Sequence, residues 1–166
     1  MVQAATPFDL DAPLDAPLDQ RRVIIRHGAD GLEMVELRWG LRPREPGGRS
    51  ATLVRAEGRT FPDHRCLVPA SEFLLSHSGG RYRFFLADGD WFYFAGIWRP
   101  AWQDWPEAYA ILTIEANADV APYNDRQLAV LRRARRMEWL DLGHPEGDLL
   151  RPLPRRSFHV ERLMAS

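Results

Sequence analysis

Lysine is absent from this chain of 166 residues, so all 22 of its basic residues are arginine. Arginine grips phosphate with a planar fork and stacks on bases, which suits nucleic acid, but a high-GC coding bias produces the same composition. The formal net charge is −1, so the chain as a whole has no electrostatic attraction for nucleic acid. Any such binding has to come from a local basic patch.

Cysteine is almost absent too, because Cys66 is the only one. A single cysteine excludes a disulfide within the chain and is consistent with a reducing compartment. No apolar run reaches the roughly 18 residues of a membrane span, and the N-terminus lacks the basic and apolar regions of a signal peptide. We therefore predict a cytoplasmic protein with no membrane segment.

Metal ligands and nucleophiles are also sparse. His64 and Cys66 are two residues apart, but two ligands do not make a metal site. Cys66 lies in an apolar run and is interpreted as a buried structural residue. The chain has no Gly-x-Ser-x-Gly elbow and no glycine-rich phosphate loop, although a triad assembled from distant residues stays open. We expect no metal and no cofactor.

The first 20 residues differ in composition from the rest. They are acidic and rich in proline, and Asp-Ala-Pro-Leu occurs twice between residues 11 and 18. Proline at this density argues against a regular helix or an inner strand. We interpret residues 1–20 as an extended arm, with a docking or occluding segment as the alternative. Residues 21–166 are predicted to form a single domain.

Short strands account for most of the remaining pattern. Polar and apolar residues alternate over 33–39, and Asp30-Gly31 before them is a hairpin signal. Asp88-Gly89 predicts a second hairpin, and a helix is predicted over 132–140. The fold class is therefore mainly β (α+β), an antiparallel, barrel-like sheet with a few peripheral helices. Strands are also predicted at 22–27, on either side of Pro69 within 65–75, and at 82–87, 91–98, 108–114, 127–131 and 157–162.

Arginines near predicted turns, combined with tryptophans, are typical of proteins that hold single-stranded nucleic acid by backbone charge and base stacking. The alternative is that the tryptophans belong to the core and the arginines to a solvated face. The basic run at 132–136 is by itself better explained as an exposed helix face. The residues concerned are Arg55, Arg59, Arg65, Arg126, Trp39, Trp98, Trp102 and Trp105.

Three segments together resemble the SRAP family, the SOS response-associated peptidases. They are Arg55-Ala56-Glu57, the Arg-Cys-Leu-Val-Pro-Ala of 65–70 followed by Phe73, and Asp125-Arg126. Supporting segments stand in the family's order at 39–43, 94–98, 111–117, 139–141 and 149–160. The likeness covers about residues 22–162.

The resemblance implies a mostly antiparallel, barrel-like β fold with a positively charged groove. Members of the family bind single-stranded DNA and crosslink to abasic sites. A cysteine directly after the initiator Met supplies an amine and a thiol that close a thiazolidine ring on the sugar aldehyde. An Asn positions the site, and a Glu and a His handle protons. The same cysteine removes a short propeptide in some members.

All four of these family positions are replaced in this sequence. Val2 follows the initiator Met, Leu53 stands at the Asn position, Leu75 at the Glu position and Asn124 at the His position. A leucine side chain cannot transfer a proton, and an asparagine side chain is a poor base. We therefore predict a divergent SRAP member with no catalytic residues, a pseudoenzyme that neither crosslinks nor cleaves itself.

Four matching or neighbouring residues remain as candidates for DNA binding. By the resemblance, Arg55 contacts a DNA phosphate. Arg126 and Glu57 either take part in DNA binding or form a structural salt bridge that shapes the groove, and Trp39 is either a stacking platform or a core residue. The leading prediction is a protein of the DNA-damage response that binds single-stranded or abasic-site DNA. Two alternatives stay open: residual peptidase or abasic-site lyase activity that uses other residues, and a protein-interaction module on an inactive SRAP fold.

Overall fold

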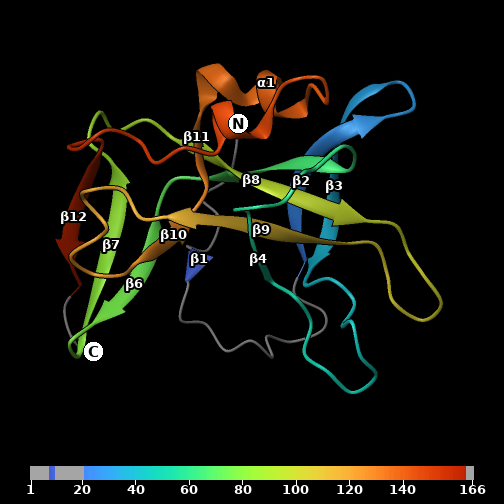
Figure 1. Cartoon of the computed structure of the whole chain (residues 1–166), viewed down its shortest axis with the longest axis horizontal. Helices are drawn as coiled ribbons and strands as arrows, with labels where there is room; N and C mark the ends of the chain where they lie inside the picture. Colours follow the sequence, from blue (N-terminus) through green and yellow to red (C-terminus); the bar gives the residue numbers. More distant parts are fainter. Residues whose placement is uncertain (1–7, 10–20, 164–166) are drawn as a thin grey trace.

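The computed structural model describes the backbone of residues 8–9 and all of residues 21–163. Except for residues 8–9, the predicted arm, Val2 included, lies outside the described residues. Strands predominate in the described part, and the helices are short and peripheral (Figure 1), which confirms the predicted mainly-β class. The strands are β1 Phe8–Asp9, β2 Arg21–Gly28, β3 Gly31–Trp39, β4 Leu53–Arg55, β5 Arg65–Ala70, β6 Phe73–His77, β7 Gly80–Leu86, β8 Phe92–Arg99, β9 Ala108–Glu115, β10 Arg126–Leu128, β11 Val130–Arg132 and β12 Phe158–Arg162, and the helices are η1 Arg133–Arg135, α1 Arg136–Leu140 and α2 Glu146–Leu149.

The strands form two sheets. The larger has the order β10-β9-β3-β2-β5-β8-β11, and β8 also pairs with β9, so five strands make a ring of hydrogen-bonded neighbours that is not a closed barrel. The smaller sheet has the order β1-β6-β7-β12. Strands β3 and β4 run parallel to β9, and β1 runs parallel to β6. The sheets are therefore mixed, and not antiparallel throughout as predicted. The sequence did not reveal this, because parallel strands are joined by long crossovers that leave no local residue pattern.

One predicted hairpin is confirmed and the other is wrong. Strands β2 and β3 pair from Arg21 opposite Arg38 to Gly28 opposite Gly31, whose φ of 119° suits glycine. The Asp88-Gly89 turn forms, with the Gly89 N–H donating to the Leu86 carbonyl at 2.9 Å. However, β7 joins the smaller sheet and β8 the larger one, so this turn carries the chain between sheets.

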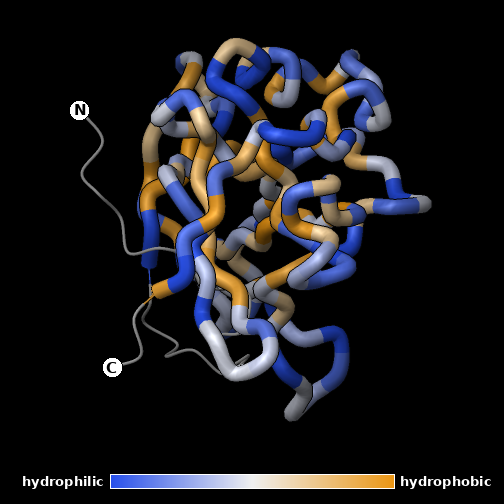
Figure 2. The backbone as a smooth tube through the Cα atoms, turned by 90° about the vertical axis from the view of Figure 1, so that its left-hand side faces the viewer, coloured by the Kyte–Doolittle hydropathy of each residue, from blue (hydrophilic) through white to orange (hydrophobic). Residues whose placement is uncertain are grey.

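The core is divided by the larger sheet into two clusters. Successive residues of a strand point to opposite faces, so Phe92 and Phe94 of β8 lie in the first cluster and Tyr93 and Ala95 in the second. The first cluster is shared with the smaller sheet, and the second is covered by α1 and α2. Strands buried on both faces give the continuous apolar runs of the sequence, and hydrophobic segments accordingly run through the interior while the protruding loops are hydrophilic (Figure 2).

Three predicted elements have different bounds. Pro69 does not separate two strands but lies inside β5, opposite Tyr93 of β8; β2 pairs with β5 only at Leu67, so no neighbour requires the missing N–H. The strand predicted at 127–131 is divided at Ala129, which bonds to β9 and β8 at once. The first residues of the predicted 132–140 helix belong instead to β11 and η1, and α1 begins at Arg136.

Candidate functional site

Strand β9 brings the retained family residues together. It pairs with β4 on one part of its length, where Arg55 lies opposite Thr113, and with β10 on another, where Arg126 lies opposite Glu115. Residues 69 positions apart in the sequence therefore meet in an ion pair. The two Nη atoms of Arg126 donate to the two carboxylate oxygens of Glu57 at 2.5 and 2.8 Å. Arg126 Nη2 also donates to Thr113 Oγ1 at 2.7 Å.

This bidentate pair fixes the charge state of Glu57. The hydrogen bonds from Arg126, together with the nearby charges of Arg126 and Arg55, lower the pKa of Glu57 to about 2. The main-chain N–H of Glu115 donates to the same carboxylate at 3.1 Å. Glu57 therefore stays ionised near neutral pH and is poorly suited to act as a general acid. Of the two interpretations left open by the sequence, the salt bridge is the one that the geometry matches.

Arg55 is the accessible cation beside this pair. Its side chain is 71% exposed, and its Nε lies 3.8 Å from Glu57 Oε1, beyond hydrogen-bond distance. A guanidinium in this situation keeps its planar set of donors available for an anion from solution. Arg126, by contrast, directs both Nη atoms at Glu57 and is only 24% exposed.

The residues predicted to replace the family's catalytic groups have side chains that are buried or engaged in the fold. Leu75 is fully buried in the first core cluster, and Leu53 packs against that cluster from β4. The Asn124 side chain accepts the main-chain N–H of Arg126 at 3.0 Å, which shapes the turn before β10. Tyr123, the residue before it, also packs against the first cluster. Val2 lies outside the described residues.

An aromatic group that the sequence did not reveal lies beside these positions. The ring of Tyr123 is 4.7 Å from Tyr82, 5.4 Å from Phe84 and 5.6 Å from His77, between centroids. Tyr82 is the cross-strand neighbour of Leu75. The one feature of the sequence that pointed to Tyr123 as a neighbour of these positions is that it directly precedes Asn124.

The other candidates for reactivity are buried or separated. Cys66 has no solvent exposure, and burial raises the pKa of its thiol, which makes it unreactive. His64 does not share a strand face with it, since its φ is 56° and its Nδ1 lies 3.1 Å from Asp63. Residues 21–163 hold no group of three His, Cys, Asp or Glu side chains arranged for a metal. None of the helices described is both long and apolar enough to cross a membrane.

Two of the predicted stacking residues are not available as open ring surfaces. Trp39 is 8% exposed, belongs to the first cluster, and donates its Nε1–H to the Thr52 carbonyl at 2.9 Å. It is thus the core residue that the sequence left as an alternative. Trp98 is half-buried, with the guanidinium of Arg26 4.2 Å from its ring centroid.

The basic run at 132–136 is largely neutralised by ion pairs. Arg132 lies 2.8 Å from Asp88, Arg133 lies 2.9 Å from Asp90, and Arg135 pairs with Glu138 of α1. The two aspartates flank Gly89 in the turn between β7 and β8. The arginines that are adjacent in the sequence therefore do not form a patch of unpaired positive charge on the surface.

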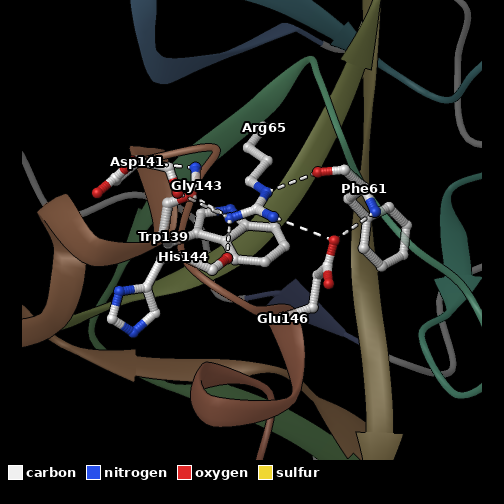
Figure 3. A network of polar contacts seen from close by, with 7 residues as sticks. All are labelled: Phe61, Arg65, Trp139, Asp141, Gly143, His144 and Glu146. Carbon is white, nitrogen blue, oxygen red and sulfur yellow. Dashed lines mark hydrogen bonds and ion pairs between the residues drawn. The ribbon is translucent and has the colours of Figure 1, made fainter.

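Arg65 has a structural role rather than a place on a binding surface. Figure 3 shows its guanidinium enclosed by main-chain carbonyls and the Glu146 carboxylate, beside the Trp139 ring at 4.6 Å. Glu146 also accepts the Phe61 N–H at 2.7 Å. The network fastens the segment with α1 and α2 to β5. The partners of Arg65 are the carbonyls of Phe61 (2.8 Å), Trp139 (3.1 Å), Asp141 (3.2 Å) and His144 (3.1 Å), and Glu146 Oε1 (3.1 Å).

Comparison with solved structures shows the same fold in bacterial proteins. A protein from Bordetella bronchiseptica, Northeast Structural Genomics Consortium target BoR19, is 22% identical with a TM-score of 0.71 over 87% of this chain and 84% of its own. A protein from Bacteroides thetaiotaomicron, target BtR8, is 20% identical with a TM-score of 0.70 over 87% and 74%. A phage-related protein from Bordetella bronchiseptica, target BoR24, is 20% identical with a TM-score of 0.67 over 90% and 81%. A comparison with curated proteins gives no match.

The family comparison covers nearly the whole chain. The model of the family described as SOS response associated peptidase (SRAP) matches residues 14–165. This match includes β4 with Leu53 and Arg55, β6 with Leu75, and β10 with Arg126, whereas Val2 precedes it. The chain therefore belongs to the SRAP family.

Proposed function

We propose that this chain binds single-stranded DNA without forming a covalent bond to it and without cleaving itself, as a non-catalytic SRAP protein of the DNA-damage response. The observation that carries the proposal is the contrast between the two sets of family positions. Arg55, Glu57 and Arg126 are retained and assembled, whereas Leu53, Leu75 and Asn124 replace the groups that the family's chemistry requires.

The loss of covalent chemistry is supported by what surrounds these positions. Leu75 is buried in the core, and the side-chain oxygen Oδ1 of Asn124 accepts a hydrogen bond from the main-chain N–H of Arg126. Glu57 is held ionised by Arg126. The one thiol of the sequence, Cys66, is buried. A crosslink needs an accessible nucleophile and a proton donor, and these family positions supply neither.

Retained DNA binding is supported by the electrostatics around Arg55. The charges of Arg126 and Glu57 compensate each other, so Arg55 supplies the available positive charge at this edge of β4 and β10. The pair also fixes the end of β4 from which Arg55 projects. A phosphate of a single strand would gain charge-assisted hydrogen bonds from Arg55, and each such contact would steepen the dependence of affinity on salt by about 0.7 in logarithmic slope.

The test uses one labelled single-stranded oligonucleotide that carries an abasic site, and the same oligonucleotide with a normal base. After incubation, half of each sample is run on a denaturing gel and half is measured by fluorescence anisotropy at about 50 and 200 mM salt. We expect no heat-stable band, and binding that weakens with salt. Arg55→Ala should weaken binding at least about tenfold, since a hydrogen bond to a charged group contributes about 1.5–3 kcal/mol. Arg155→Ala is the matched control, because Arg155 is exposed and its substitution removes the same charge away from Arg55, Glu57 and Arg126.

Each alternative gives a different result. A heat-stable band would contradict the loss of crosslinking. Strand scission that borohydride converts into a trapped adduct would indicate abasic-site lyase activity through an amine. If neither oligonucleotide binds at either salt concentration, DNA binding is refuted and the interaction-module hypothesis becomes the stronger one.

A further inference from the structure

A pocket of about 420 Å³ lies on the face of β4 opposite to Arg55. Val54 lines this pocket and packs against the second core cluster, whereas its neighbour Leu53 packs against the first. Since successive strand residues point to opposite faces, Arg55 projects to the same side as Leu53, away from the pocket. The walls come from the segment between β3 and β4, from β4 and the residues after it, and from the end of β8 through the connection to the first residue of β9: Leu41, Arg42, Arg44, Ala51, Val54, Arg59, Ile97, Arg99, Pro100, Ala101, Trp102, Trp105, Pro106 and Ala108.

The charge of this pocket is of one sign. Four arginines line it and no acidic residue does. None of the four forms an ion pair within the described part of the chain, although most of the 132–136 run is paired with carboxylates. Four uncompensated cations around one concavity create a positive potential that is relieved when an anion binds. The arginines are Arg42, Arg44, Arg59 and Arg99.

The pocket also presents indole rings held in place by the backbone. Trp102 and Trp105 exchange main-chain hydrogen bonds of 3.0 Å in both directions, and the Trp105 Nε1–H donates to the Gly40 carbonyl at 3.2 Å. Trp102 is 52% exposed. The guanidinium of Arg42 lies 3.5 Å from the Trp102 ring centroid. Arg42 covers one face of this indole, so a flat ligand ring would stack on the other face, with its charged group within reach of the arginines.

A fifth guanidinium lies behind Trp105. Arg38 is buried, its carbon Cζ is 3.8 Å from the Trp105 ring centroid, and its Nε has no hydrogen-bond partner among the residues described. Arg38 also makes no ion pair within residues 21–163. A buried cation without a carboxylate is costly, and it adds to the positive potential on this side of the molecule.

We propose that this pocket binds a small anion that carries a flat ring, of the size of a mononucleotide. Its volume lies within the roughly 300–1,000 Å³ of small-molecule sites. The apolar walls from Leu41, Val54 and Ile97 suit the ring, and the arginines suit a phosphate. This binding is separate from the DNA binding proposed for Arg55, because the two sites use opposite faces of β4.

The experiment is isothermal titration calorimetry of the full chain with AMP as the probe, and with adenosine and inorganic phosphate as its two halves. We expect AMP to bind at least about tenfold more tightly than either half, since ring and phosphate act together. Arg59→Ala and Arg44→Ala should each weaken AMP binding about fivefold to twentyfold. Trp102→Ala should weaken AMP but not phosphate, and Trp102→Phe should restore most of the loss.

Two control variants separate this site from the rest of the surface. Arg155→Ala removes the same charge outside the pocket, and Arg55→Ala removes it on the other face of β4; both should leave AMP affinity within about twofold. Arg44 and Arg59 are exposed and make no side-chain hydrogen bond among the residues described, so their variants should melt at the wild-type temperature.

The inference is overturned if AMP binds no more tightly than phosphate, which would leave only an adventitious anion site. It is also overturned if Arg55→Ala weakens AMP binding as much as Arg59→Ala does, because the ligand would then occupy the DNA site. If the wild-type protein binds single-stranded DNA but not AMP, the pocket proposal alone is refuted. If the wild-type protein binds AMP but not single-stranded DNA, the proposed function alone is refuted.

Discussion

Replacing Arg65 by methionine removes the guanidinium that fastens α1 and α2 to β5, while methionine retains an unbranched apolar side chain. The guanidinium donates to four main-chain carbonyls and to the Glu146 carboxylate. In the variant, the carbonyl oxygens of Phe61 and Trp139 would stay buried without their donor. Glu146 would lose its cationic partner but keep the hydrogen bond from the Phe61 N–H.

The expected loss in free energy of unfolding follows from these contacts. Breaking a buried ion pair by removing one partner costs about 3–5 kcal/mol. Each hydrogen bond to a charged group adds about 1.5–3 kcal/mol in isolation, but several bonds to one guanidinium are not additive. Water reaches part of the site, because Glu146 is 22% exposed. We therefore expect a loss of about 4 kcal/mol, which is about a quarter or more of a typical total of 5–15 kcal/mol.

The assay is equilibrium unfolding in urea with thermal melting beside it. A loss of about 4 kcal/mol should lower the melting temperature by roughly 8–16 °C in a chain of this size. Arg155→Met is the control and should change stability by less than about 0.5 kcal/mol. Combining Arg65→Met with Glu146→Gln should cost less than the sum of the single changes. A loss below about 1 kcal/mol for Arg65→Met would refute the structural role assigned to this network.

Three further outcomes test other parts of the structure. The pKa of Glu57 is lowered in the folded protein, so the ion pair stabilises the fold at pH values above the ordinary pKa of a carboxyl group, and this stabilisation is lost as pH falls toward 2. Because Glu57 is 46% exposed, the stabilisation is about 1 kcal/mol. If the difference in stability between wild type and Glu57→Gln does not shrink from pH 7 to 3, this expectation is wrong. Cys66 should react with a thiol reagent only after denaturation, and fast labelling of the native protein would disprove its burial. Gly96→Ala would place a Cβ 2.9 Å from Cys66 Sγ and 3.0 Å from the Ala110 carbonyl oxygen, so urea unfolding should show a loss of about 1–3 kcal/mol, whereas unchanged stability would mean that β5 and β9 can yield.

Short motifs alone led to the prediction that Leu53, Leu75 and Asn124 replace the family's catalytic groups. The structure adds what these side chains contact. The hairpin of β2 and β3 was equally accessible, because Asp30-Gly31 and the alternation after it are properties of adjacent residues. The turn at Asp88-Gly89 was recognised for the same reason, but its place between two sheets was not.

Charge is where sequence reasoning was least informative. The run from Arg132 to Arg135 is the densest basic segment, yet its partners Asp88 and Asp90 lie 44 and 43 positions away. Arg65 was grouped with surface arginines, although its partners lie up to 81 positions further along the chain. The arginines of the pocket, in turn, come from three segments that no local pattern connects.

The sequence by itself determined the family, the mainly-β class and the positions of most strands, because these depend on residue type and on spacing within a few positions. Only the tertiary structure decided which strands run parallel, which arginines are neutralised or buried, and that Leu53 and Val54 face different sides of the sheet. The physical reason is that strand pairing, burial and charge compensation depend on contacts between residues far apart in the chain. Such contacts form only when the two sheets have assembled and packed together.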